Sequence, residues 1–148
     1  MAATGLKIAA LFAALPLMRA DQPSDLRSQL NVIARGLSAG DAAAAMVPFD
    51  KSLETYDKLS TYFAGLTNAF SIVNEIDVSD EDDTASEIKA TVHWTITLSD
   101  LGSNYTERRV GDISVRLVLK DRKWKIVEFA PIDLFDPRPK PWPKVPPT

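Results

Sequence analysis

The spacing of apolar residues predicts helices at the start of the chain. Over residues 24–40 they recur in steps of four, three and four, at Leu26, Leu30, Ile33 and Leu37. This spacing places them on one stripe of an amphipathic helix, which Ser24 can cap and Gly40 can end. A short alanine-rich helix is expected from Ala42 to about Val47, because Pro48 stops it.

A third helix is expected from about Leu53 to Phe70, with Ser52 as its N-cap. Its apolar residues recur every three or four positions without a break, at Leu53, Tyr56, Leu59, Phe63, Leu66 and Phe70. This is the most regular helical pattern in the chain, and it predicts that one face of the helix is buried along its whole length.

Beyond residue 70 the apolar period changes from 3.6 to 2, which predicts strands. We expect them at residues 72–78, 88–98, 108–120 and 123–129. An acidic turn is expected at Ser79–Thr84 and a tight turn at Asp121–Arg122. Neighbouring strands joined by turns indicate an antiparallel sheet. Three helices can cover one face of that sheet, so the predicted fold class is α+β, with N-terminal helices packed on an antiparallel sheet.

The first twenty residues have the pattern of a secretory signal peptide. Lys7 is the only charge before the apolar run Ile8–Leu17, and Ala20 closes the stretch with a small residue. That run is too short to cross the roughly 30 Å hydrocarbon core as a helix, so no permanent membrane span is expected. We therefore expect cleavage after Ala20 and a periplasmic or extracellular mature protein beginning at Asp21. An uncleaved N-terminal anchor and a poorly ordered tail are the alternatives.

Composition then excludes several kinds of chemistry. The chain has 148 residues, enough for one domain, with no cysteine and a single histidine. These counts exclude a disulfide scaffold, a cysteine nucleophile and a multi-histidine metal centre. A net charge of −3 gives no indication of nucleic-acid binding. The acidic segment Asp77–Asp83 lacks the glycine and closing glutamate of a calcium loop, so neither a metal nor another cofactor is expected.

Three short motifs follow one another along the chain. They are Leu37-Ser38-Ala39-Gly40-Asp41, Pro48-Phe49-Asp50 and Lys123-Trp124-Lys125-Ile126-Val127. Together with the order of helices and strands, they resemble the nuclear transport factor 2-like (NTF2-like) superfamily, also called the SnoaL-like or cystatin-like cone, and most of all its bacterial secreted members. The resemblance covers about residues 24–135. It implies a curved sheet that wraps the long helix and leaves a pocket at the wide end of a cone.

Some members of that superfamily use the pocket for acid–base chemistry on small apolar molecules, which needs a carboxylate or a histidine–aspartate pair inside it. Here His93 lies on the polar face of its strand, and the two longest predicted strands carry no acid on their apolar face. We therefore assign no catalytic residue. Candidates to line a ligand pocket are the residues Tyr56, Asn74, Trp94, Arg109 and Glu128.

Two interpretations of these candidates remain open. In the first they are structural, with Tyr56 in the core, Asn74 bonded to neighbouring backbone, and Glu128 and Arg109 in water at strand ends. In the second Glu128 pairs with Arg109, while Asn74 and Tyr56 orient a ligand. Trp94 forms an apolar wall in both.

Two functional classes also remain open. The first is an exported, non-catalytic domain over residues 21–135 that binds a small apolar ligand or another protein. We expect it to form a homodimer through the polar, β-branched outer face of its sheet. The second is a small pocket enzyme of the lyase or isomerase type. Residues 136–148 hold six of the ten prolines, which favour an extended tail after the domain.

Overall fold

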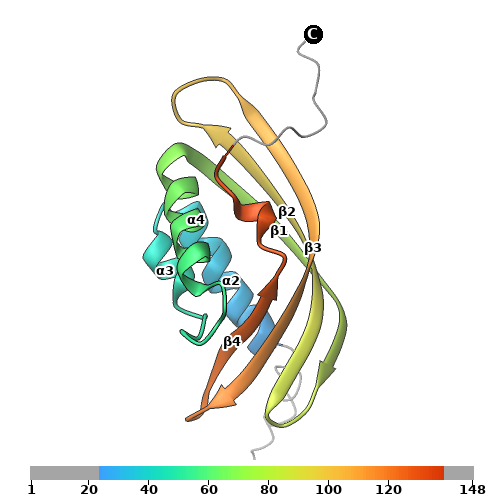
Figure 1. Cartoon of the computed structure of the whole chain (residues 1–148). Helices are drawn as coiled ribbons and strands as arrows, with labels where there is room; N and C mark the ends of the chain where they lie inside the picture. The colour runs from blue at the N-terminus through green and yellow to red at the C-terminus, as the bar shows by residue number, and fades with distance from the viewer. Residues whose placement is uncertain (1–23, 139–148) are drawn as a thin grey trace, which may run out of the picture.

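The computed structural model describes residues 24–138 (Figure 1). Three helices come first: α2 (Ser24–Ser38), α3 (Ala42–Met46) and α4 (Tyr56–Ala69). One antiparallel sheet follows in sequence order, made of β1 (Phe70–Asp83), β2 (Glu87–Asp100), β3 (Thr106–Lys120) and β4 (Lys123–Ala130). The short 3₁₀ helix η2 (Asp133–Phe135) comes last. The expected signal peptide, residues 1–20, and residues 139–148 of the expected tail lie outside the described residues.

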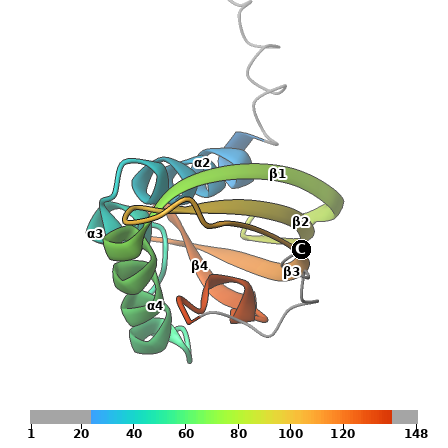
Figure 2. The ribbon, with the colours of Figure 1, turned by 90° about the horizontal axis from the view of Figure 1, so that it is seen from above.

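The helices cover the concave face of the sheet, which curves around them as seen from above (Figure 2). This arrangement confirms the predicted α+β class. The apolar stripe of α2 faces the core and is buried from Leu26 to Leu37. Gly36 allows α2 and α3 to touch, because a Cβ atom there would lie 2.5 Å from the backbone nitrogen of Ala45. No helix between Ser24 and Arg138 is long and apolar enough to cross a membrane.

The third helix begins later than the pattern predicts. Its N-cap position is Thr55, which makes no side-chain capping bond. Ser52 does not cap it, because the Ser52 hydroxyl donates to the Asp50 carboxylate. The N–H of Leu53 donates to the Asp50 carbonyl at 3.0 Å, so residues 50–53 form a turn that delays the helix.

The central strand β2 shows the predicted alternation. Its even-numbered residues from Ile88 to Leu98 are buried against the helices. In β1, by contrast, the predicted turn at Ser79–Thr84 is wrong, since the strand continues to Asp83. Its pairing with β2 shifts between Ser79 and Asp82, and Asp80 has a positive φ of 49°. Aspartate tolerates that conformation, so the acidic residues form a bulged strand end.

The tight turn between β3 and β4 is confirmed. Asp121 and Arg122 both have positive φ, 50° and 67°. This conformation matches the mirror-image two-residue turns that join twisted antiparallel strands.

After β4 the chain folds back into the open end of the cone. Residues 131–138, the C-terminal segment, include η2, which lies between the helices and the sheet (Figures 1 and 2). Phe135 is fully buried there. The packed part extends beyond the expected domain boundary at residue 135, because Asp136 is 3% exposed and Pro137 packs on Gly65 of α4.

Candidate functional site

Trp94 and Asn74, two of the predicted pocket residues, are bonded to each other. Trp94 is fully buried on the helix-facing side of β2, and its Nε1–H donates to Asn74 Oδ1 at 2.8 Å. Asn74 in turn donates from Nδ2 to the carbonyl oxygen of Ala34 on α2 at 3.3 Å. The pair therefore ties β2 and β1 to α2, which agrees with the structural interpretation of both residues.

Aromatic rings occupy the space where the superfamily resemblance implies a pocket. Phe135 lies at their centre, with its ring centroid 5.3 Å from Trp94, 5.3 Å from Phe63 and 5.8 Å from Phe129. Phe49 contacts Phe129 at 5.0 Å. Phe135 therefore contacts both Trp94 on β2 and Phe63 on α4. The C-terminal segment thus contributes the central side chain of this aromatic cluster.

Arg109 holds the C-terminal segment in place. Its side chain is 1% exposed and bonds both carboxylate oxygens of Glu107, through Nε at 2.8 Å and Nη2 at 3.2 Å. Nη1 donates to the carbonyl oxygens of Leu134 at 2.9 Å and Asp136 at 2.6 Å, and Nη2 donates to that of Arg138 at 3.3 Å. An arginine has five N–H donors, so every donor is engaged.

The interpretation that pairs Glu128 with Arg109 is wrong, and so is the other interpretation's placement of Arg109 in water, since Arg109 is 1% exposed. The Glu128 side chain is 62% exposed on the outer face of the sheet and bonds Arg116 at 3.3 Å. The reason is a bulge, because the pairing of β3 with β4 shifts between Arg116 and Leu117 and leaves Val127 as an extra residue. Glu128 therefore lies on the opposite face from Ile126, although the two differ by an even number of positions.

Sequence reasoning also missed Glu107. The predicted strand began at residue 108, whereas β3 begins at Thr106 and carries Glu107 on its inner face. The spacing of Glu107 and Arg109, two residues apart on one strand, was the available signal for this ion pair. The expected domain, residues 21–135, includes Leu134 and Phe135, but no sequence signal placed their side chains in the interior of the cone.

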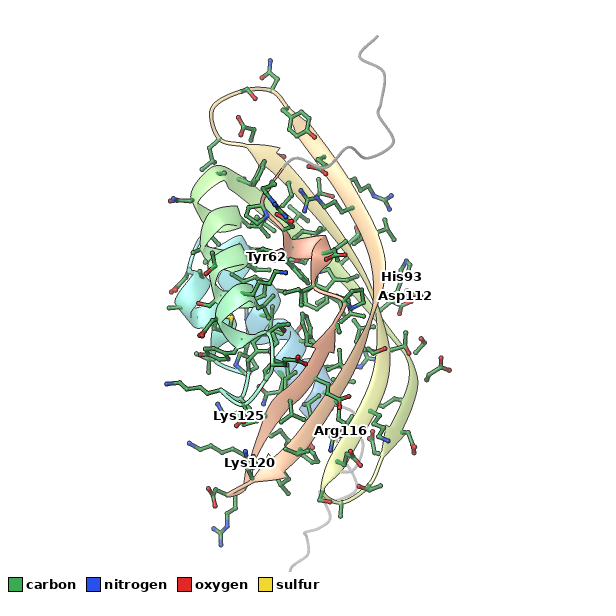
Figure 3. All side chains as sticks on the ribbon, viewed as in Figure 1. Tyr62, His93, Asp112, Arg116, Lys120 and Lys125 are labelled. Atoms are coloured by element: carbon green, nitrogen blue, oxygen red, sulfur yellow. The ribbon has the colours of Figure 1, made fainter. Side chains whose placement is uncertain are left out.

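A second ion pair lies within the C-terminal segment. The guanidinium of Arg138 bonds the Asp136 carboxylate, and this hydrogen bonding raises the pKa of Arg138. Tyr62 on α4 also interacts with Arg138 and faces the segment in Figure 3. Charged hydrogen bonds therefore engage Leu134, Asp136 and Arg138 in the second half of the C-terminal segment.

Tyr56, the remaining candidate, lies outside the cone. It is half-buried and lines a surface groove of about 560 Å³. We call this groove the outer groove. The outer groove lies between α3, the chain that follows it, and β4. Its lining residues are Ala43, Met46, Val47, Phe49, Asp50, Lys51, Tyr56 and Lys125. Of the five predicted pocket residues, only Tyr56 reaches this groove.

The acidic residue of the outer groove, Asp50, is paired with a cation and hydrogen-bond donors. Asp50 accepts hydrogen bonds from the hydroxyl and the backbone N–H of Ser52, and both its oxygens lie 3.3 Å from Lys120 Nζ. The Ser52 bonds, followed by Lys120, hold the pKa of Asp50 below its usual range. Within residues 24–138 no three histidine or acidic side chains come together as a metal-binding group.

Comparison with known proteins identifies the fold. Neither a scan of protein-family profiles nor a search of curated protein sequences found a match. Among solved structures, a conserved protein from Planctomyces limnophilus has a TM-score of 0.69 at 8% identity, over 76% of this chain and 95% of that one. An NTF2-like superfamily protein from Salmonella enterica has a TM-score of 0.62 at 14% identity, over 72% and 86%. The chain has the NTF2-like fold.

Other structural neighbours have names that mention enzymes. A putative scytalone dehydratase from Novosphingobium aromaticivorans has a TM-score of 0.66 at 9% identity, over 78% of this chain and 85% of that one. At such low identity the likeness concerns the fold alone. The activity of this NTF2-like chain must therefore be argued from its own residues.

Proposed function

We propose that this NTF2-like protein is a non-catalytic binding domain that holds a small ligand in the outer groove. The observation that carries the proposal is the filled interior of the cone, where Phe135 contacts Trp94, Phe63 and Phe129. The outer groove, at about 560 Å³, falls within the range of about 300–1,000 Å³ that small-molecule sites occupy. The apolar surface that it offers a ligand comes mainly from Val47, which is 62% exposed, whereas Met46 and Phe49 are 5% and 2% exposed.

The enzyme class receives less support from the same geometry. A lyase or isomerase of this fold would need an acid or base with free lone pairs inside an apolar pocket. The inward-facing acid Glu107 accepts from Arg109 at both oxygens, and Oε1 also accepts from the Tyr105 hydroxyl at 3.3 Å. Glu107 therefore acts as the partner of a structural arginine.

The proposal can be tested with the neutral fluorescent dye N-phenyl-1-naphthylamine. We expect the dye to bind the purified protein, and Val47→Asp to weaken binding at least fivefold because it places a charge on the apolar groove wall. Leu101→Asp is the matched control, since Leu101 is 65% exposed and Val47 62% exposed, and Leu101 lies far from the groove in the β2–β3 hairpin. Equal binding by both variants and the wild type would overturn the proposal.

We further propose that the domain forms a homodimer through the outer face of its sheet. Val73 and Val110 are large apolar side chains exposed on that face, at 59% and 42%. Val110 pairs with Thr95 and Val73 pairs with Thr97. Thr95 is only 7% exposed, so the exposed patch across β1, β2 and β3 consists of Val73, Thr97 and Val110. An exposed apolar patch on the outer face of a sheet favours contact with a second copy of itself.

Charged pairs flank this patch. His93 Nδ1 lies 2.7 Å from Asp112 Oδ1, and the two side chains lie together on the convex face in Figure 3. The Arg116 guanidinium bonds Glu87 and Glu128, so it already has partners within its own subunit. These pairs balance the charges of His93, Asp112 and Arg116 within one subunit.

Sedimentation equilibrium tests the dimer. At tens of micromolar we expect the wild type to be dimeric and Val110→Arg to be monomeric, because the substitution places two like charges in the middle of the contact. Leu101→Arg, an equally drastic change outside the sheet face, should remain dimeric. A monomeric wild type, or a Val110→Arg dimer, would contradict the proposed interface.

Finally, we propose that the protein is exported and cleaved after Ala20. The support is the apolar run Ile8–Leu17 between Lys7 and Ala20. N-terminal sequencing of the protein from the exported fraction should begin at Asp21. A soluble cytoplasmic product that retains Met1 would contradict export.

A further inference from the structure

The outer groove combines an apolar wall with uncompensated positive charge. We propose that it selects a small amphipathic anion, meaning an apolar chain or ring that bears one carboxylate or similar anionic group. This inference rests on the proposed function and adds the chemical class of the ligand. It is carried by three observations: which charges line the groove, which of them are already paired, and where the apolar side chains lie.

The first observation is that the side chains lining the outer groove leave it with a positive charge. Three charged residues line the outer groove: Asp50, Lys51 and Lys125. The Asp50 carboxylate is satisfied by Ser52 and by Lys120, a cation that does not itself line the groove. The charge of Asp50 is thus balanced from outside the groove, and two lysines remain to set its sign.

The second observation concerns those lysines. Lys125 Nζ donates to the carbonyl oxygen of Val47 at 3.0 Å, which holds the ammonium group at the groove wall. An ammonium has three donors, so a carbonyl partner leaves others for a ligand and does not cancel the charge. Lys51 has no hydrogen bond or ion pair with any residue between Ser24 and Arg138. Figure 3 shows Lys120 and Lys125 at the same end of the sheet, on the side of the helices.

The third observation concerns the apolar surface. Val47 is 62% exposed although it stands directly after α3 among buried residues. Met46 and Phe49, on either side of the Val47–Pro48 pair, line the groove while their remaining surface is buried in the core. A ligand that covers Val47 would remove apolar surface from water at about 25 cal/mol per Å². Its anionic group could then remain at the rim, close to the lysines.

A basic partner would not suit this site. The C-terminal tail of the chain carries Lys140 and Lys144, which have the same sign as the groove. A small anion with an apolar body matches both the wall and the rim, because a charge at the open rim stays partly hydrated while the body is buried.

Three probes with the same eight-carbon chain separate charge from hydrophobicity: octanoate, 1-octanol and octylammonium. Calorimetric titration of the full-length mature protein at pH 7.5 and low salt should show octanoate binding at least tenfold more tightly than either other probe. Combined Lys51→Gln and Lys125→Gln should reduce octanoate affinity at least fivefold and leave octanol unchanged. Lys89→Gln is the matched control, because Lys89 is exposed on the outer face of β2 and should change nothing. Salt should weaken octanoate binding alone.

The outcomes distinguish the ligand class from the proposed function. If 1-octanol or octylammonium binds as tightly as octanoate and displaces N-phenyl-1-naphthylamine, the anionic class is wrong while the groove remains a binding site. If the dye binds Val47→Asp as well as it binds the wild type, the proposed function itself fails. Undiminished octanoate binding by the double lysine variant would also overturn the inference, because the affinity would then have another source.

Discussion

Arg109→Met removes the cation that joins β3 to the C-terminal segment. Methionine preserves the length and apolar contacts of the side chain, but it leaves the Glu107 carboxylate buried without its partner. It also deprives three carbonyl oxygens of their charged donor, those of Leu134, Asp136 and Arg138. The substitution therefore tests whether this buried arginine holds the C-terminal segment inside the cone.

The expected magnitude follows from burial. Glu107 is 8% exposed and Arg109 1% exposed, so their ion pair is nearly dry. Breaking such a pair on one side costs about 3–5 kcal/mol of folding free energy. Combining Arg109→Met with Glu107→Leu removes both charges, and the double variant should be at least about 1.5 kcal/mol more stable than the single one, since replacing a whole buried pair is often near neutral.

Urea denaturation followed by circular dichroism measures these free energies, and chymotrypsin cleavage after Phe135 reports locally on the segment. We expect the single variant to be cleaved faster than the wild type. Arg108→Met is the matched control, because Arg108 is exposed on the outer face of the same strand, and it should stay within about 0.5 kcal/mol of the wild type. A loss below about 1 kcal/mol for Arg109→Met would refute the role assigned to Arg109.

Three other perturbations test the packing around it. Trp94→Ala should cost about 3–5 kcal/mol in urea denaturation through lost burial and a cavity, and a loss below about 1 kcal/mol would contradict its central position. Gly65→Ala should destabilise the full chain, because the new Cβ would lie 2.7 Å from Pro137 Cγ. In a chain that ends at Asp136 this clash is absent, so the same substitution should be stabilising through the higher helix propensity of alanine. The pKa of Glu81 is raised, first by burial and then by a hydrogen bond with Asp83. The folded state therefore favours protonated Glu81, and this contribution to the free energy of unfolding is lost as pH rises through the raised pKa. Glu81→Gln should therefore be more stable than the wild type near pH 7 and equal to it below about pH 4, and a pH-independent difference would refute this.

Much of the fold was predictable because its periodicities are undisturbed. The burial of Leu26 and Leu37 on α2, and of Ile88 and Leu98 on β2, follows from steps of 3.6 and 2 along the chain. The tight turn at Asp121–Arg122 was predictable as well, because two polar residues between alternating segments are typical of a hairpin.

The errors arose where local geometry breaks the period. One extra residue, Val127, moved Glu128 to the outer face, and a bulge before Asp82 turned a predicted loop into strand. A bulge leaves no mark in the alternation of short sequence windows, so parity cannot predict the face beyond it.

The candidate site was less predictable than the fold. Tyr56 reached the outer groove, but Lys51 and Lys125 could not be placed there from the sequence, because a groove between a helix, a loop and a strand depends on tertiary packing. The filling of the cone by Phe135 was equally hidden, since it depends on the chain turning back after β4. Side chains that meet across such long separations carry no local signal.

The cone interior is packed, and we propose that ligand binds outside it. Two-dimensional ¹H–¹⁵N NMR of the protein with and without saturating N-phenyl-1-naphthylamine tests this most directly, because ring currents shift nearby resonances. We expect large shifts for the amides of Val47 and Lys51, while the indole N–H of Trp94, bonded to Asn74, stays in place. A shifted Trp94 indole with unchanged groove amides would contradict it.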